Sequence, residues 1–212
     1  MFNAATLEKL FHAVIAAGRN PPLDADMTYL VGQTSDNESS VLDAARKFRG
    51  PIGFIGYDDV RQVCGFPGFS AWKDALANRS IGANRVVGIL GSFVEVAGRR
   101  TIHTLSELEA VARYAGHKGL RRVVIVAPHW HLLRSFMSVV LPARRYCPDA
   151  HFYPALGAPL PWGEEVAHSQ GRVRGTRADF MFTETVRIFT YQEQGNLPSA
   201  EEALAYLECR NT

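Results

Sequence analysis

Two histidines and an arginine follow an apolar segment in the middle of the chain. His129, His131 and Arg134 come shortly after the run VVIVA at 123–127. Such an unbroken apolar run is typical of a parallel strand covered on both faces, and open α/β sheets bind ligands just beyond the carboxyl ends of their strands. Histidine titrates near neutral pH, and the arginine fork fits phosphate or carboxylate groups. We therefore expect a catalytic set in which His131 is a general acid or base, Arg134 clamps an anion one helical turn later, and His129 lies beside them.

The spacing of His129 and His131 also allows a metal site. Alternate residues of an extended backbone face the same side, so both imidazoles could bind zinc or another divalent metal. The candidates for a third ligand are Asp58, Asp59 and His103. Because the sequence has no second tight ligand pair, acid–base chemistry is the preferred interpretation and metal binding the alternative. A third interpretation, a capping histidine beside a surface arginine, gives the pair no chemistry.

A polar loop early in the chain is a second candidate binding element. The run 28–31 is predicted to be a short strand, and Gly32 follows it directly. Gln33 and Ser35 then precede a predicted helix. Glycine and hydroxyl groups at a strand-to-helix turn suit a phosphate or carboxylate at the helix N-terminus. Gly32, Gln33 and Ser35 are therefore candidate ligand-binding residues, and a solvated polar turn is the alternative. Dinucleotide binding has little support, because a GxGxxG fingerprint is absent.

Two aspartates follow the second predicted strand. Asp58 and Asp59 come directly after the run 51–56 and Tyr57. An acidic residue at this position of a nucleotide-binding fold can bind ribose hydroxyl groups. Aspartates also begin loops for local hydrogen-bonding reasons, so the two interpretations stay open.

The segment before the central strand has the signals of a capped helix. Thr104 and Glu107 have the spacing of a capping box, in which the hydroxyl and the carboxylate satisfy free amides at a helix start. Leu105, Leu108 and Val111 then give an apolar stripe at helical spacing. Gly116 or Gly119 is expected to end this helix.

The segments around this helix and strand resemble the YdcF/SanA/ElyC family, a large bacterial group named mainly as a domain of unknown function. The resemblance rests on the pattern Thr-x-x-Glu, short helix, VVIVAP, then His, Leu, Leu, Arg. The matching positions are Thr104, Glu107, His131 and Arg134, and Glu107 stands where the family usually has an asparagine. The similarity spans residues 27–184.

This resemblance implies a Rossmann-like fold in which the first loop, here Gly32, Gln33 and Ser35, lines the site. In the family an acidic residue precedes the Thr-x-x-Glu helix start, and Glu95 is the nearest candidate in this chain. Some members are reported to bind S-adenosylmethionine or to act in the cell envelope. The envelope members generally carry membrane segments, which this sequence lacks.

The remaining pattern completes an α/β chain. Further helices are predicted over 5–17, 39–48, 69–77, 132–140, 179–191 and 200–209, and further strands over 85–90 and 150–155. We expect a single domain over 1–212 with a three-layer, Rossmann-like architecture, in which helices cover both faces of an open, mainly parallel sheet of about five strands. The N-terminal helix is expected to pack on this domain.

The last third of the chain carries three more expectations. Pro142 is expected to stop the helix that begins at residue 132. The basic segment 156–174 is expected to be a long loop, either a binding loop or an excursion without a role. The apolar residues of the helix 179–191 are expected in the core: Phe180, Phe182, Val186, Ile188 and Phe189.

Bulk properties limit the class of protein. The 212 residues suffice for one sizeable core, and a net charge of +2 gives no global attraction to nucleic acid. Three scattered cysteines without a CxxC pair favour a reduced, cytoplasmic protein. No run is long enough for a membrane helix, and no signal peptide, Walker A or G-x-S-x-G motif is present.

These observations predict a cytoplasmic small-molecule enzyme that acts on a phosphorylated or nucleotide-like anionic ligand by hydrolysis or group transfer. Two alternatives stay open: a non-catalytic binder of S-adenosylmethionine or a similar nucleotide, and a regulator of envelope synthesis. The sequence leaves the cofactor unknown, with S-adenosylmethionine possible and a divalent metal less favoured. It also leaves the oligomeric state open.

Overall fold

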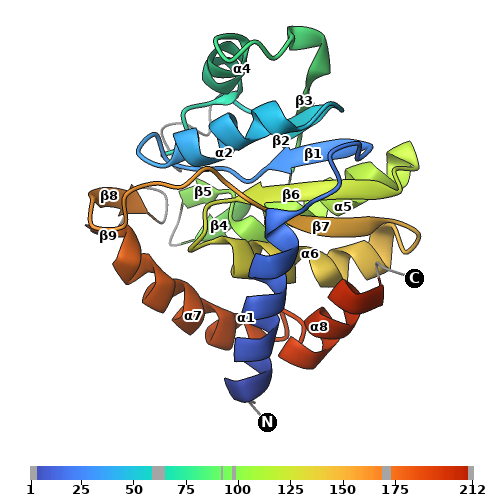
Figure 1. Cartoon of the computed structure of the whole chain (residues 1–212), viewed down its shortest axis with the longest axis vertical. Coiled ribbons are helices and arrows are strands. Elements are labelled where there is room, and N and C mark those ends of the chain that lie inside the picture. Colours follow the sequence, from blue (N-terminus) through green and yellow to red (C-terminus); the bar gives the residue numbers. More distant parts are fainter. Residues whose placement is uncertain (1–3, 59–64, 92, 97–98, 169–172, 210–212) are drawn as a thin grey trace.

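The computed structural model describes residues 4–58, 65–91, 93–96, 99–168 and 173–209. At its centre is an open sheet of five parallel strands in the order β3-β2-β1-β6-β7 (Figure 1). The strands are β1 (Met27–Leu30), β2 (Ile52–Ile55), β3 (Val86–Ile89), β6 (Arg122–Ala127) and β7 (His151–Leu156). The expected α/β fold with an open, parallel sheet of about five strands is confirmed.

The strand order has one topological switch point, between β1 and β6. The chain moves outward from β1 to β2 and β3, then returns to place β6 on the other side of β1, where Leu30 pairs with Val126. The segments that leave β1 and β6 therefore diverge to opposite sides of the sheet. In open α/β sheets the crevice at such a point, beyond the carboxyl ends of the strands, is where ligands bind.

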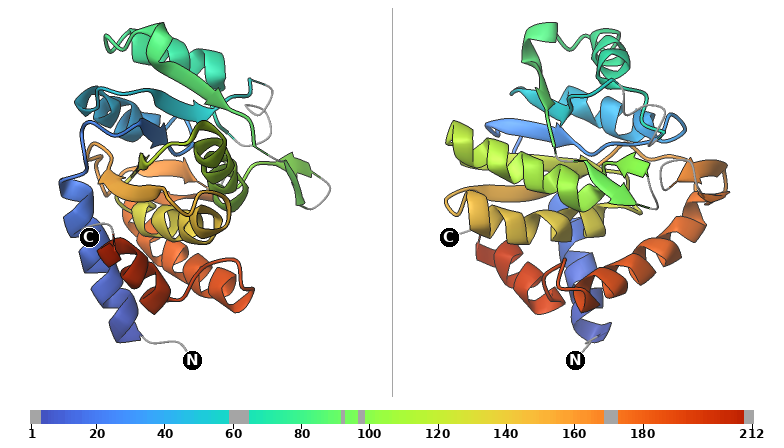
Figure 2. Two further views of the ribbon diagram at one scale, coloured as in Figure 1. Left: turned by 90° about the vertical axis from the view of Figure 1, so that its right-hand side faces the viewer. Right: turned by 180° about the vertical axis from the view of Figure 1, so that it is seen from behind.

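Helices cover both faces of the sheet, as expected for a three-layer fold. They are α1 (Ala4–Arg19), α2 (Glu38–Ala44), α4 (Phe69–Ala77), α5 (Thr104–Lys118), α6 (Leu132–Tyr146), α7 (Arg177–Glu193) and α8 (Ala200–Glu208), with short 3-10 turns η1 (Ala45–Lys47) and η2 (Ala83–Arg85). α5 and α6 lie side by side on one face, seen from behind in Figure 2. α2 and α4 pack on the other face.

The alternating direction of the side chains along each strand explains why the sheet has one core on each face. Tyr29 and Ile125 point into the core beneath α5 and α6, whereas Leu30 and Val126 point into the core beneath α2 and α4. Successive side chains of a strand face opposite sides, so a strand that is apolar throughout is buried on both. This is why the run 123–127 marks β6 so clearly.

α6 continues past Pro142, so the expected stop at that residue is wrong. A proline inside a helix removes one backbone donor and destabilises the helix. The residues around it, Val139, Val140 and Ala143, are buried in the core. Their burial outweighs the lost hydrogen bond and carries the helix on to Tyr146.

The expected core set of the 179–191 helix is only partly right. Phe180 and Ile188 are buried, but Phe182 is 74% and Val186 45% exposed. The buried stripe of α7 is instead Arg177, Phe180, Glu184 and Ile188, at helical spacing. The hydrophobic pattern misleads here because two of the inward positions carry charges.

Two hairpins lie outside the strands that the sequence pattern predicts. The segment 156–174 is not a plain loop, because β8 (Glu165–His168) pairs with β9 (Val173–Thr176). The second hairpin, β4 (Val94–Val96) with β5 (Arg99–Thr101), projects from the body of the molecule (Figure 2). Within the described ranges, no helix combines the length and the apolarity needed to cross a bilayer.

Candidate functional site

His131 lies at the switch point, where the chain leaves β6 and enters α6. It is the N-cap residue of α6 and is only 4% exposed. Its Nδ1 lies 3.3 Å from the side-chain amide of Gln33, in the segment that leaves β1. Its Nε2 lies 3.2 Å from the hydroxyl of Thr104, at the start of α5, and 2.8 Å from Nη2 of Arg134. Three segments that are distant in sequence therefore meet at one imidazole.

The arginine contact determines which nitrogen of His131 carries the hydrogen. A guanidinium group can only donate, so Nε2 must accept from Arg134. A neutral imidazole then carries its hydrogen on Nδ1, the nitrogen that faces the Gln33 side chain. Burial, and then the charge of Arg134, hold the pKa of His131 well below 6.5, so the ring is neutral at physiological pH.

Glu184 of α7 is the acidic centre of the site, and the sequence interpretation missed it. Arg134 binds it with two hydrogen bonds, Nε to Oε2 at 2.5 Å and Nη2 to Oε1 at 3.2 Å. Arg187 donates to Oε1 at 2.7 Å, and His168 of β8 contacts the same oxygen at 3.1 Å. Burial acts to raise the pKa of Glu184, but Arg134 and the neighbouring groups outweigh it and hold that pKa well below 4.5. The available sequence signal was a carboxylate in helical register between Phe180 and Ile188.

A second buried carboxylate, Glu107, supports the first loop. Its Oε1 accepts hydrogen bonds from the backbone N–H of Gly32 at 2.7 Å and from the hydroxyl of Tyr29 at 3.0 Å. Burial raises the pKa of Glu107 to about 7, against the lowering effect of both hydrogen bonds and of Arg134. The space beside it, bounded by Tyr29 and Ile55 among others, is too small to hold a water molecule. Glu107 therefore titrates near neutral pH inside the protein.

The predicted capping box of Thr104 and Glu107 is wrong, and the reason concerns the site. The N-cap of α5 is His103, whose side chain accepts from Ser106 N–H while the Ser106 hydroxyl contacts the His103 backbone. The cap therefore lies one residue earlier than expected. Thr104 and Glu107 are released from capping, and both turn into the interior toward His131 and Gly32. Gly119, in the left-handed conformation, ends the helix, and it is one of the two glycines that the sequence analysis predicts for this position.

The first loop also binds the β8–β9 hairpin. Thr34 and Asn37 both donate a hydrogen bond to the backbone oxygen of Ala167, each at a distance of 3.0 Å. Arg177, only 2% exposed, donates to the side chain of Asn37 at 2.9 Å and to the backbone oxygen of Asp36 at 2.8 Å. The hairpin and the start of α7 are thereby fixed over the segment that carries Gln33. These contacts span more than a hundred residues, so local sequence patterns could not reveal them.

The other predicted site residues lie elsewhere. Asp58 is exposed and accepts from the backbone and hydroxyl of Ser70 at the start of α4, as a loop-forming aspartate does. Ser35 is exposed. Asp59 lies outside the described residues, as does the side chain of Glu95 in β4.

The two histidines of the HxH pair do not converge. His129 is half-buried and its ring meets that of Trp162, whereas His131 points into the Gln33–Thr104–Arg134 cluster. The turn after β6 breaks the extended backbone that the metal interpretation required. No group of three or more His, Cys, Asp and Glu side chains is placed to hold a metal ion in the part of the chain that is described.

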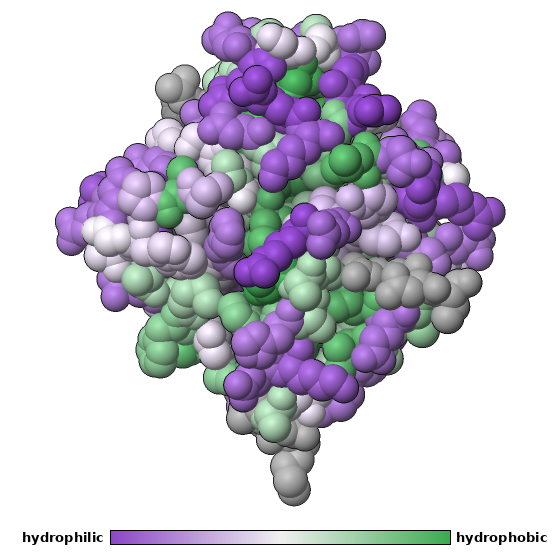
Figure 3. Space-filling model, in the orientation of Figure 1, coloured by the Kyte–Doolittle hydropathy of each residue, from purple (hydrophilic) through white to green (hydrophobic). Residues whose placement is uncertain are grey.

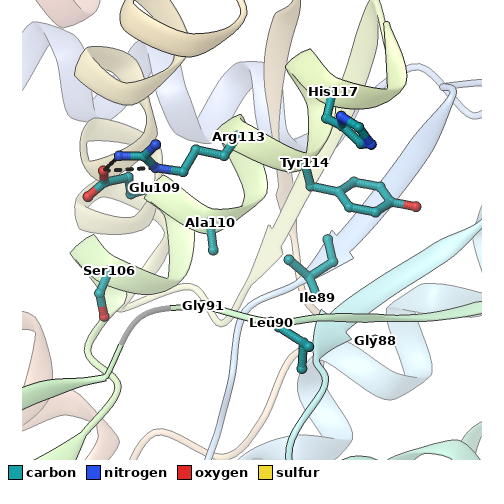
Figure 4. Close-up of a pocket in the computed structure, with 10 residues that line it drawn as sticks. All are labelled: Gly88, Ile89, Leu90, Gly91, Ser106, Glu109, Ala110, Arg113, Tyr114 and His117. Carbon is teal, nitrogen blue, oxygen red and sulfur yellow. Dashed lines mark hydrogen bonds and ion pairs between the residues drawn. The ribbon is translucent and has the colours of Figure 1, made fainter.

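A separate cavity of about 410 Å³ lies between the end of β3 and α5 (Figure 4). Glu109 and Arg113 line it, and their side chains form an ion pair at 2.8 Å along the helix. Arg113 also donates to the hydroxyl of Tyr146. Because its charged groups already neutralise one another, this cavity offers no unmatched charge to a ligand.

The switch point thus gathers six of the predicted residues: Gly32, Gln33, Thr104, Glu107, His131 and Arg134. The sequence interpretation did not include Tyr29, His168, Glu184 and Arg187, which complete the same network. No family model, no curated protein and no solved structure matches the chain.

Proposed function

We propose that the protein is an enzyme that acts on a small phosphorylated or nucleotide-like anion, by hydrolysis or group transfer. The observation that carries the proposal is the contact of His131 with Gln33, Thr104 and Arg134. An ion pair that serves stability alone needs only Arg134 and Glu184. Here a neutral imidazole is added beside the guanidinium, at the switch point where open α/β sheets bind ligands.

Arg134 keeps donors available for an anion. Its Nε and Nη2 groups are engaged by Glu184 and His131. Its Nη1 group makes no hydrogen bond to any residue that the structure describes. This nitrogen is also not one of the fully buried polar atoms that lack a partner. Two N–H groups of an oriented guanidinium therefore remain for phosphate oxygens, for which arginine has suitable geometry.

His131 would act as a general base. Its lowered pKa keeps it neutral at pH 7, so it can accept the proton of an attacking water or hydroxyl group. Glu184 holds Arg134 in place, as supporting carboxylates commonly do for charged site residues. Gly32 and Gln33 would form the wall of the site on the β1 side.

One observation favours a second candidate, a non-catalytic binder of S-adenosylmethionine or a similar nucleotide. The accepting nitrogen of His131 is already occupied by Arg134 at 2.8 Å and lies within 3.2 Å of the Thr104 hydroxyl. An imidazole with its lone pair engaged holds a ligand better than it takes a proton. The resemblance to the YdcF/SanA/ElyC family allows the same activity, and a cytoplasmic location stays a prediction.

A turnover assay separates these candidates. Purified protein is incubated with nucleotides, sugar phosphates and S-adenosylmethionine, and products are followed by phosphate release and mass spectrometry. The enzyme proposal expects turnover that falls at least a hundredfold in His131→Gln, with the surface variant Arg113→Lys unchanged. Binding without product supports the binder, and turnover that is the same in His131→Gln rejects His131 as the base.

A further inference from the structure

A cavity of about 590 Å³ opens between the end of α1, the end of η1 and the segments that follow β6 and β7. Its polar lining includes Arg19, Lys47 and the half-buried His129. It shares no residue with the contacts of His131. Its volume lies within the range of small-molecule sites.

The charges in this cavity are unmatched. Arg19 and Lys47 make no ion pair or hydrogen bond with any described residue, and none of the lining residues is an aspartate or glutamate. Other arginines of the described chain are committed to carboxylates, among them Arg79, Arg113, Arg122, Arg134 and Arg177. Burial, and then the charges of Arg19 and Lys47, lower the pKa of the His129 imidazole.

Another part of the lining is apolar. It includes Phe48, Leu156 and Leu23, the last of which is 50% exposed. Figure 3 shows apolar surface in the middle of the molecule, bordered by hydrophilic side chains. A ligand that fits both halves therefore combines an anionic group with an apolar one.

The walls of the cavity are fixed before any ligand arrives. A Cβ atom on Gly18 would lie 3.0 Å from Leu132 and 3.3 Å from Leu156, so the end of α1 is in close contact with the end of β7. Ser40 and Ala158 exchange two hydrogen bonds, at 2.7 and 2.8 Å, which hold the segment after β7 against α2. A preformed site loses less conformational freedom on binding.

We infer that this cavity binds an organic phosphate, with the phosphate held by Arg19, Lys47 and His129 and the apolar part packed on Phe48 and Leu156. The inference rests on other residues than the proposed catalytic site and does not depend on it. Arg19 and Lys47 also end helical turns, where a cation balances the partial charge of the last carbonyl groups. That explanation accounts for their position but not for the open, carboxylate-free cavity between them.

Titration calorimetry with phenyl phosphate and inorganic phosphate tests the inference on the full chain. We expect phenyl phosphate to bind more tightly than inorganic phosphate. Lys47→Gln and Arg19→Gln should each weaken binding about tenfold, and the neighbouring Arg46→Gln, an exposed cation outside the cavity, less than twofold. Both variant sites are exposed, so loss of folding does not confuse the result.

The position of the ligand is read from the imidazole NMR signal of His129, assigned with His129→Gln. It should shift on addition of phenyl phosphate in the wild type and in Arg134→Lys, whose proposed role concerns the other site. If Lys47→Gln and Arg46→Gln behave alike, or if His129 does not respond, the two cations only balance helix ends and the inference is wrong. Equal affinity for phenyl phosphate and inorganic phosphate would contradict the proposed contact of the ligand with the apolar lining.

Discussion

Arg134 and Glu184 form a two-point ion pair inside the protein, and both side chains are less than a tenth exposed. The pair joins α6 to α7 and orients the guanidinium toward His131. It places the last long helix of the chain in direct contact with the switch point of the sheet. His168 of the hairpin and Arg187 contact the same carboxylate, so Glu184 connects three other side chains.

Glu184→Gln should therefore destabilise the protein by about 3–5 kcal/mol, because it leaves the buried charge of Arg134 without its partner. The matched control is Glu109→Gln, which breaks the exposed pair with Arg113 and should cost about 0–1 kcal/mol. Urea unfolding at pH 7 measures both values. A cost for Glu184→Gln no larger than that of the control would show that the network contributes little to stability.

Glu107 makes stability depend on pH. Its pKa is about 7 in the folded protein against a usual 4.5, so between these values the unfolded chain releases a proton that the folded chain keeps. Stability from this group is greatest below pH 4.5 and falls as the pH rises to about 7, by roughly 3 kcal/mol at 1.36 kcal/mol per pKa unit.

Glu107→Gln removes the titration and preserves an oxygen for the N–H of Gly32. We expect the variant to lose less stability than the wild type between pH 5 and pH 8 in urea unfolding. Identical pH profiles for the two proteins would mean that Glu107 does not titrate in this range.

A side chain at Gly32 would collide with the end of the Ile55 side chain. A Cβ atom there would lie 2.6 Å from Cδ1 of Ile55 and 3.4 Å from Oε1 of Glu107. Gly32→Ala should cost about 1 kcal/mol, the lower end of the range for overpacking, because only the end of the Ile55 side chain has to move. Gly163→Ala is the control, since nothing lies within 4 Å of a Cβ atom at that position and the change should be neutral or slightly stabilising. Equal unfolding midpoints for the two variants would contradict the close packing at Gly32.

Arg177 should control the mobility of the β8–β9 hairpin. Its guanidinium contacts Asn37, Asp36 and Glu164 at once, a geometry that lysine cannot reproduce. Arg177→Lys is expected to speed hydrogen exchange of residues 165–168 at least tenfold, with little change in the strands of the central sheet. Uniform acceleration across the whole protein would instead show a global loss of stability.

The sequence predicts the sheet well because the strands are apolar on both faces and end at recognisable turns. The run 123–127 and the start of the helix at Leu132 were placed to within a residue, whereas the end of that helix was not. The grouping of Gly32, Gln33, His131 and Arg134 followed from one rule, that parallel strands present their carboxyl ends at the same edge.

What the sequence did not reveal depends on long-range contacts or on buried charge. The β8–β9 hairpin is fixed by Thr34, Asn37 and Arg177, which are remote in the chain. Glu184 was missed because a hydrophobic pattern ranks Phe182 above a carboxylate for burial, and only the paired charge of Arg134 reverses that order. The cap of α5 was misplaced by one residue because His103 is an uncommon cap and Ser106 satisfies it.

The most direct test of the central claim is a thermal-shift measurement with nucleotides, sugar phosphates and S-adenosylmethionine on the wild type, His131→Gln, Arg134→Lys and the control Arg113→Lys. A ligand at the switch point should stabilise the wild type and Arg113→Lys by roughly 2.7 kcal/mol at a hundredfold excess over Kd. The same ligand should shift folded His131→Gln and Arg134→Lys by less than half of that amount. An undiminished response in both variants would place the ligand elsewhere and contradict the account.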